Sequence, residues 1–134
     1  EEAEVWTAGQ LPNGTHGSEI LDLWYLFACE LTEEQLDIYY EPILQVELDA
    51  EKRAVNLIRD RDLPFDIAQY TREANSYLIG HAELRRRRAW FTPGVAPYRI
   101  QAILDEMPSD FLSHSYTMEP LPAHLQRLYD PCFA

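Results

Sequence analysis

The sequence predicts an all-α fold: a single compact domain of about six helices, built on an antiparallel helix pair and preceded by an extended N-terminal arm. Apolar residues recur at intervals of three and four through the middle of the chain, as on the buried face of a helix. Proline, serine or threonine opens most of these segments. The 134 residues, 46% of them hydrophobic, suffice for one domain with a core. We therefore assign residues 1–17 to the arm and residues 18–134 to the helical domain.

The arm and the segment that follows it have different patterns. Residues 1–17 show neither helical nor alternating periodicity and contain three glycines and a proline. Ser18 is a suitable N-cap for a helix over residues 19–30. That helix would be apolar on nearly every side, which is typical of a central helix or of one shared with a partner.

Two further helices are expected in the next thirty residues or so. Thr32 and Gln35 have the spacing of a capping box, which predicts a short helix ending near Tyr40. Pro42 suits the first position of a helix, so we predict a new helix over residues 43–60. The beginning of this segment also alternates as a strand would, but no second strand pattern exists to pair with it.

The most periodic part of the chain covers residues 66–90 and predicts a long helix that runs antiparallel to the helix over 43–60. A break rich in proline and glycine follows it. After the break, three short helices are expected over residues 98–106, 109–115 and 122–129, each opened by proline or serine. They would wrap around the helix pair.

The formal net charge of −12 is distributed unevenly. The first 51 residues contain 13 acidic residues and no Lys or Arg, whereas the remainder contains 10 acidic and 11 basic residues. General binding of DNA or RNA is disfavoured, because such binding depends on neutralising phosphates. An acidic half would instead attract a basic surface. We therefore expect the partner to be another protein with a basic surface.

Patterns for membranes, cofactors and metals are missing from the sequence. No apolar stretch approaches the roughly 20 residues of a membrane span, and no phosphate loop or dinucleotide fingerprint occurs. None of the four histidines has Asp or Glu three positions before it, which argues against a di-iron centre. We expect no cofactor, no metal and two reduced cysteines, Cys29 and Cys132. Without a signal-peptide pattern, we expect a soluble protein, intracellular or in an organellar matrix after N-terminal processing.

Four consecutive arginines, Arg85, Arg86, Arg87 and Arg88, form the most distinctive local feature. On a helix they would fan around most of the circumference, so at least one must contact the rest of the protein or a partner. Arginine suits bidentate contacts with carboxylates and stacking on rings such as that of Trp90. The cluster could neutralise acidic groups of its own chain or bind a partner's acidic surface. Binding of RNA or an anionic cofactor is disfavoured by the overall negative charge.

Aromatic residues near the two ends of the sequence favour docking on another protein. Trp6 has nothing local to pack against, and Phe133 lies next to the last residue. Trp, Tyr and Arg are also the residue types enriched at the centres of interfaces. With the charge asymmetry, they predict a non-catalytic acidic protein-interaction module, such as a small accessory or structural subunit involved in complex assembly. An acidic inhibitor or immunity-type protein is a further alternative. The candidate partner-binding residues are Trp6, the four arginines, Trp90 and Phe133.

A second cluster supports a different function, that of a small helical enzyme or minor enzyme subunit. Tyr70, Glu73, Tyr77 and His81 share one face of the predicted long helix and could line a pocket suited to proton transfer. A packed, hydrogen-bonded histidine in a tyrosine-rich core explains the same spacing. We therefore assign no catalytic residue and keep the enzyme as the alternative.

Overall fold

The structure, a computed structural model, describes residues 32–112, 116 and 120–133. Its elements are α2 (Glu33–Asp60), α3 (Ile67–Arg87), η2 (Pro97–Arg99), α4 (Gln101–Leu104), α5 (Ala123–Leu128) and η3 (Asp130–Phe133), where η denotes a 3-10 helix. These described residues contain helices and no strands, which confirms the predicted all-α class. None of the helices in these ranges is both long and apolar enough to span a bilayer. The arm predicted over residues 1–17 and the helix predicted over 19–30 lie outside the described residues.

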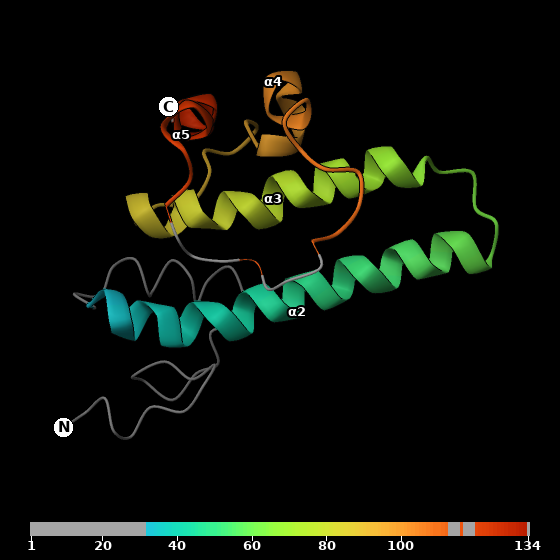
Figure 1. Cartoon of the computed structure of the whole chain (residues 1–134), viewed down its shortest axis with the longest axis horizontal. Coiled ribbons are helices and arrows are strands. Elements are labelled where there is room, and N and C mark those ends of the chain that lie inside the picture. Colours follow the sequence, from blue (N-terminus) through green and yellow to red (C-terminus); the bar gives the residue numbers. More distant parts are fainter. Residues whose placement is uncertain (1–31, 113–115, 117–119, 134) are drawn as a thin grey trace.

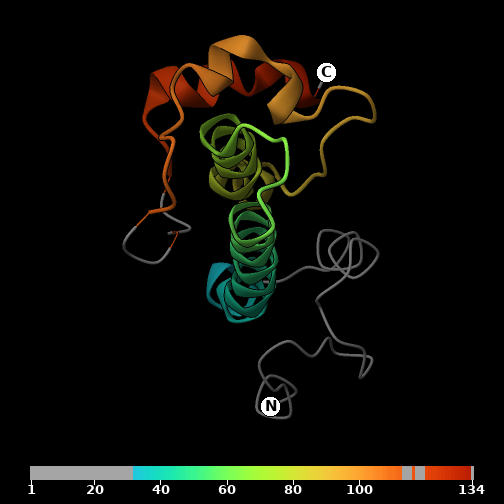
Figure 2. The ribbon, with the colours of Figure 1, turned by 90° about the vertical axis from the view of Figure 1, so that its right-hand side faces the viewer.

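The helices are stacked in three tiers. α2 and α3 lie side by side and run antiparallel, joined by a short connection (Figure 1). The end-on view places α4 and α5 against the face of α3 that is turned away from α2 (Figure 2). Because α3 is covered on two sides, even polar residues such as Asn75, His81 and Glu83 are buried on it.

α2 begins with the predicted capping box. The Thr32 hydroxyl accepts a hydrogen bond from the Gln35 backbone N–H (3.2 Å), and the Thr32 N–H donates to the Gln35 side chain (3.0 Å). These bonds satisfy backbone groups that a helix start leaves unpaired. The segment over residues 44–49, which alternates as a strand would, is helical and lies in the middle of α2.

α2 is one helix where the sequence predicted two, because Pro42 lies inside it rather than at a helix start. An internal proline costs a helix about 3 kcal/mol. Continuing the helix nevertheless keeps Tyr40, Ile43 and Leu44 on one buried face. Burying each such side chain contributes about 1.5–3 kcal/mol, so tertiary packing outweighs the local effect of the proline. The predicted helix boundary at residues 40–43 was wrong for this reason.

α3 matches the predicted long helix except at its end. The Asp66 side chain caps its start by accepting a hydrogen bond from the Gln69 N–H (3.1 Å). The helix ends at Arg87, three residues earlier than predicted. Arg88 adopts the left-handed conformation (φ 49°) and donates its N–H to the Leu84 carbonyl, which closes the helix.

The C-terminal third contains less helix than predicted. Within the described ranges there are four α-helices rather than about six. The helix predicted over 98–106 is divided into η2 and α4, the one over 109–115 is not helical at residues 109–112, and α5 accounts for most of the one over 122–129. Segments this short have little helical stability of their own, so their contacts with α3 decide their conformation.

Side chains from all three tiers form the core. A larger cluster comprises the buried residues Tyr40, Ile43, Leu84, Phe91, Ile103, Met107, Tyr129 and Cys132. A smaller one comprises Leu44, Leu48, Leu78 and Tyr116. The Cys132 thiol is free, and burial raises its pKa to about 11. Cys29 lies outside the described residues, so the expectation of two reduced cysteines stays a prediction.

Gly80 lies at the closest approach between α3 and the C-terminal segment. A Cβ atom at this position would lie 2.9 Å from Cε1 of Tyr129 and 3.2 Å from Cζ of Phe91. The Tyr129 ring cannot easily move, because its buried hydroxyl donates to the Ser76 carbonyl (2.7 Å). We expect Gly80→Ala to lower the free energy of unfolding by about 1–2 kcal/mol, since overpacking outweighs the helix propensity of alanine.

Urea unfolding followed by circular dichroism measures this effect. The matched control is Ala68→Gly, which exchanges the same two residues at an exposed position of α3 and reports helix propensity alone. A Gly80→Ala protein as stable as the wild type, or more stable, would contradict the proposed packing constraint.

Candidate functional site

A cleft between α2 and α3 gathers carboxylates and tyrosine rings. It has a volume of about 340 Å³, within the range of ligand-binding pockets. One wall is formed by residues one turn apart on α2, the other by residues at three- and four-residue intervals on α3, and η2 contributes one tyrosine. We call it the acidic cleft; its lining residues are Glu47, Glu51, Tyr70, Glu73, Ala74, Tyr77 and Tyr98.

The polar groups of the acidic cleft are partly connected to one another. The Tyr70 hydroxyl donates a hydrogen bond to Oε2 of Glu51 (2.6 Å), and the Gln69 amide donates to Glu73 (3.3 Å). Burial and the bond to Glu51 raise the pKa of Tyr70 to about 12. Burial and the nearby Glu51 carboxylate raise the pKa of Glu47 above its usual value. Tyr70 is therefore a hydrogen-bond donor and a ring surface in this cleft, since its ionisation is disfavoured.

Among the described residues, the carboxylates of the acidic cleft have no basic partner. None of the ion pairs within the described part of the chain involves Glu47, Glu51 or Glu73. In the same part, no group of three or more His, Cys, Asp or Glu residues is arranged to hold a metal ion. Burial, and to a lesser degree the negative charges of Glu47 and Glu51, raise the pKa of Tyr77. Perturbed titratable groups gathered in a cleft are a frequent property of ligand-binding sites.

His81, which the sequence placed with Tyr70, Glu73 and Tyr77, does not line the cleft. It is fully buried, and its ring packs edge-on against the Tyr77 ring with 4.8 Å between centroids. Nδ1 donates to the Tyr77 carbonyl (2.8 Å), so Nδ1 carries the proton, while Nε2 makes no hydrogen bond in the described part of the chain. Burial lowers the pKa of His81 to about 4, so the ring is uncharged at neutral pH.

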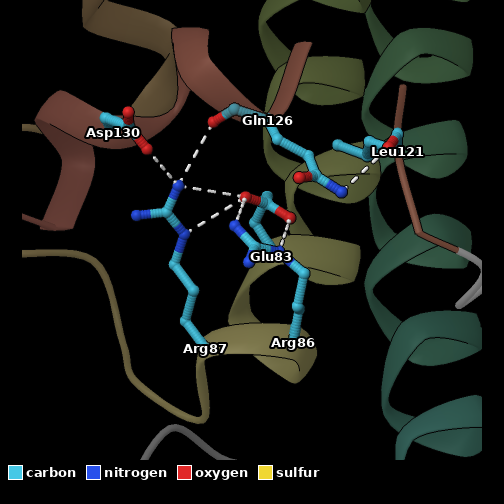
Figure 3. Close-up of polar contacts among 6 residues, drawn as sticks. All are labelled: Glu83, Arg86, Arg87, Leu121, Gln126 and Asp130. Carbon is cyan, nitrogen blue, oxygen red and sulfur yellow. Dashed lines mark hydrogen bonds and ion pairs between the residues drawn. The ribbon is translucent and has the colours of Figure 1, made fainter. Parts of the chain in front are cut away.

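The predicted arginine cluster binds a buried acidic residue of the same chain. Arg86 donates two hydrogen bonds to the Glu83 carboxylate, both 2.8 Å, and Nε of Arg87 donates a third (3.1 Å; Figure 3). The Glu83 side chain has no exposed surface. A buried carboxylate is strongly unfavourable without such partners, so these two arginines have a structural role. Arg85 and Arg88 also have interaction partners.

Arg87 extends this network to the C-terminal segment. It forms an ion pair with Asp130 and donates to the Gln126 carbonyl (3.2 Å), as Figure 3 shows. Its guanidinium group lies over the Phe133 ring, 4.4 Å from the centroid. One arginine is therefore held by two carboxylates, a carbonyl and an aromatic ring.

Two of the predicted aromatic partner-binding residues pack against other rings of the same chain. Trp90 is half-buried and packs against Tyr77 and Phe91, with centroid distances of 6.1 and 5.7 Å. Phe133 is half-buried against Phe91, at 5.4 Å. Trp6 lies outside the described residues. Contact of any of these residues with a partner stays a prediction.

Glu47, Glu51 and Tyr98 also line the cleft, although they were not among the predicted site residues. The i, i+4 spacing of the two glutamates was a usable signal, because it places them on one side of a helix. Tyr98 could not be found in this way, since it reaches the cleft from η2. Glu83 was also overlooked, although it precedes Arg86 and Arg87 by the spacing of helical ion pairs.

The fold and the site together define an all-α protein with an acidic, tyrosine-lined cleft between its two long helices. In comparisons with known proteins, no family model, no curated protein and no solved structure matches the chain. The function is therefore inferred from the geometry of the cleft.

Proposed function

We propose that this protein is a non-catalytic acidic interaction module, and that its acidic cleft binds a basic segment of another protein. The observation that carries the proposal is the set of three cleft carboxylates, Glu47, Glu51 and Glu73, without a basic partner among the described residues. A positively charged ligand would relieve their mutual repulsion and fill a concave surface that is already formed.

The surrounding charge supports the same proposal. The first 51 residues contain no Lys or Arg, so the part of α2 that leads to the cleft carries only acidic charges. Such a field increases the rate at which a basic partner approaches, and the cleft then supplies the specific contacts. An accessory subunit and an inhibitor would use this surface in the same way.

The state of His81 favours binding over the enzymatic alternative. A general acid or base must reach the proton that it transfers. His81 is buried outside the cleft wall and is uncharged at neutral pH. Tyr70 and Tyr77 have raised pKa values, which makes them poor bases at neutral pH. These features support a ligand-binding role for Tyr70 and Tyr77.

Fluorescence anisotropy tests the proposal with a labelled peptide in which arginine and lysine alternate with glycine. We expect the triple variant Glu47→Gln, Glu51→Gln, Glu73→Gln to bind about tenfold or more weakly than the wild type, since each charge pair contributes roughly 0.5 kcal/mol or more. Added salt should weaken wild-type binding, because it screens the attraction.

The matched control removes the same charge elsewhere on α2, through Glu34→Gln, Glu41→Gln and Asp49→Asn, which are all exposed. This control should retain most of the affinity. If both triple variants lose affinity equally, the peptide senses net charge alone and the cleft is not the binding site. A wild-type protein that does not bind the peptide would also overturn the proposal.

A further inference from the structure

We propose that the acidic cleft accepts one arginine side chain of the partner, with its guanidinium group stacked on a tyrosine ring and bound by the cleft glutamates. This inference rests on the proposed function and makes it more specific. The ligand is then one particular side chain in a defined arrangement, rather than any positively charged group. The rings of the cleft, its carboxylates and an arginine site elsewhere in the same molecule support this proposal.

The rings distinguish the cleft from a simple acidic patch. Tyr70 and Tyr77 line it from α3 and Tyr98 from η2, while Glu47 and Glu51 line it from α2. Tyr98 is 43% exposed, a large fraction for an aromatic side chain, so its ring is accessible to a ligand. Carboxylates and aromatic faces together suit a planar cation that can form hydrogen bonds at its edge and stack through its face.

These requirements favour arginine over lysine. A guanidinium group is planar, weakly hydrated and able to donate several hydrogen bonds in a fixed arrangement. An ammonium group is a compact, strongly hydrated charge that would have to lose more hydration to enter a cleft lined by rings. The two glutamates on α2 are one turn apart, which provides acceptors on one side of the cleft.

The protein already contains an arginine site of this composition. Arg87 lies over the Phe133 ring at 4.4 Å and contacts the carboxylates of Glu83 and Asp130. The acidic cleft contains the same kinds of groups, namely two or more carboxylates and aromatic rings. Among the described residues, no basic side chain forms an ion pair with these carboxylates. The cleft therefore has the composition of an arginine site whose arginine comes from another molecule.

The experiment compares two peptides that are identical except for one central residue, arginine or lysine, flanked by glycine and serine. Titration into the full chain is followed by NMR of the tyrosine ring signals. We expect the arginine peptide to bind about fivefold or more tightly than the lysine peptide, with shifts at the rings of Tyr70, Tyr77 and Tyr98. Tyr98→Leu should weaken binding of the arginine peptide about fivefold, and Tyr98→Phe should preserve it, because phenylalanine retains the ring.

The matched control is Phe65→Leu, which removes an exposed aromatic ring outside the cleft and should leave both affinities unchanged. Equal affinities for the two peptides, with loss of binding in the cleft triple glutamine variant, would overturn the arginine inference and leave the proposed function intact. No binding of either peptide would overturn both. If free arginine binds as tightly as the arginine peptide, the inference that the guanidinium group belongs to a segment of a partner protein would be overturned.

Discussion

Asn75→Ala is expected to lower the free energy of unfolding by about 3 kcal/mol, at roughly 1 kcal/mol for each of three hydrogen bonds. Asn75 is fully buried on α3. Its amide donates to the carbonyls of Pro108 and Asp110, both at 3.0 Å, and its oxygen accepts from the hydroxyl of Tyr116. Removing the side chain leaves two carbonyls and a hydroxyl without these partners, and a buried unpaired group is costly.

Urea unfolding gives the stability change, and hydrogen exchange at residues 108–112 shows whether this segment loosens first. Tyr116→Phe removes one bond of the network and should cost about 1 kcal/mol. Asn56→Ala makes the same substitution at an exposed position of α2 and should cost less than about 0.5 kcal/mol. Similar losses in Asn75→Ala and Asn56→Ala would refute a structural role for the buried amide.

The second large effect concerns the pH dependence of stability. Burial lowers the pKa of His81 to about 4 from its ordinary value of 6.5. Between these two values the unfolded chain binds a proton at His81 that the folded chain does not, so acid favours unfolding. We expect His81 to contribute about 3 kcal/mol of stability above pH 6.5 that is progressively lost as the pH falls to about 4.

The measurement is the free energy of unfolding of the wild type and of His81→Leu at several pH values from neutral to about 4. The carboxylates titrate in both proteins, so the difference between the two pH profiles isolates the contribution of His81. His124→Leu removes an exposed histidine and is the control that should follow the wild type. Parallel profiles for the wild type and His81→Leu would show that the imidazole is not held uncharged in the folded state.

Sequence patterns that depend only on neighbouring residues predicted helices correctly. The capping box at Thr32 and Gln35 and the periodicity of residues 66–90 both depend on neighbours along the chain, and both led to helices at the right places. Pro42 misled the prediction, because its usual position at a helix start holds only when no tertiary contact compensates for an internal proline. The predictions for the short C-terminal segments were wrong for a related reason, because contacts with α3 decide the conformation of these segments.

The candidate site was predictable only along one helix. Helical spacing put Tyr70, Glu73 and Tyr77 on one face, and the structure places these three in the wall of the cleft. The same spacing included His81, which lies one turn further along and is buried in the core. Spacing on one helix cannot indicate where a cleft ends, because the residues that close it belong to other elements. Tyr98 comes from such an element, so no periodicity connects it with the rest.

By itself, the sequence determined the all-α class, the long helix α3 and the concentration of acidic charge in the first 51 residues, since these depend on composition and local spacing. The tertiary structure alone decided how the charged residues are divided between roles. Arg86 and Arg87 form ion pairs with Glu83, whose carboxylate is buried by folding. Folding also brings Asp130 next to Arg87, which pairs with it as well. The glutamates of the acidic cleft form no ion pair within the described part of the chain, because no basic residue lines the cleft that α2 and α3 form.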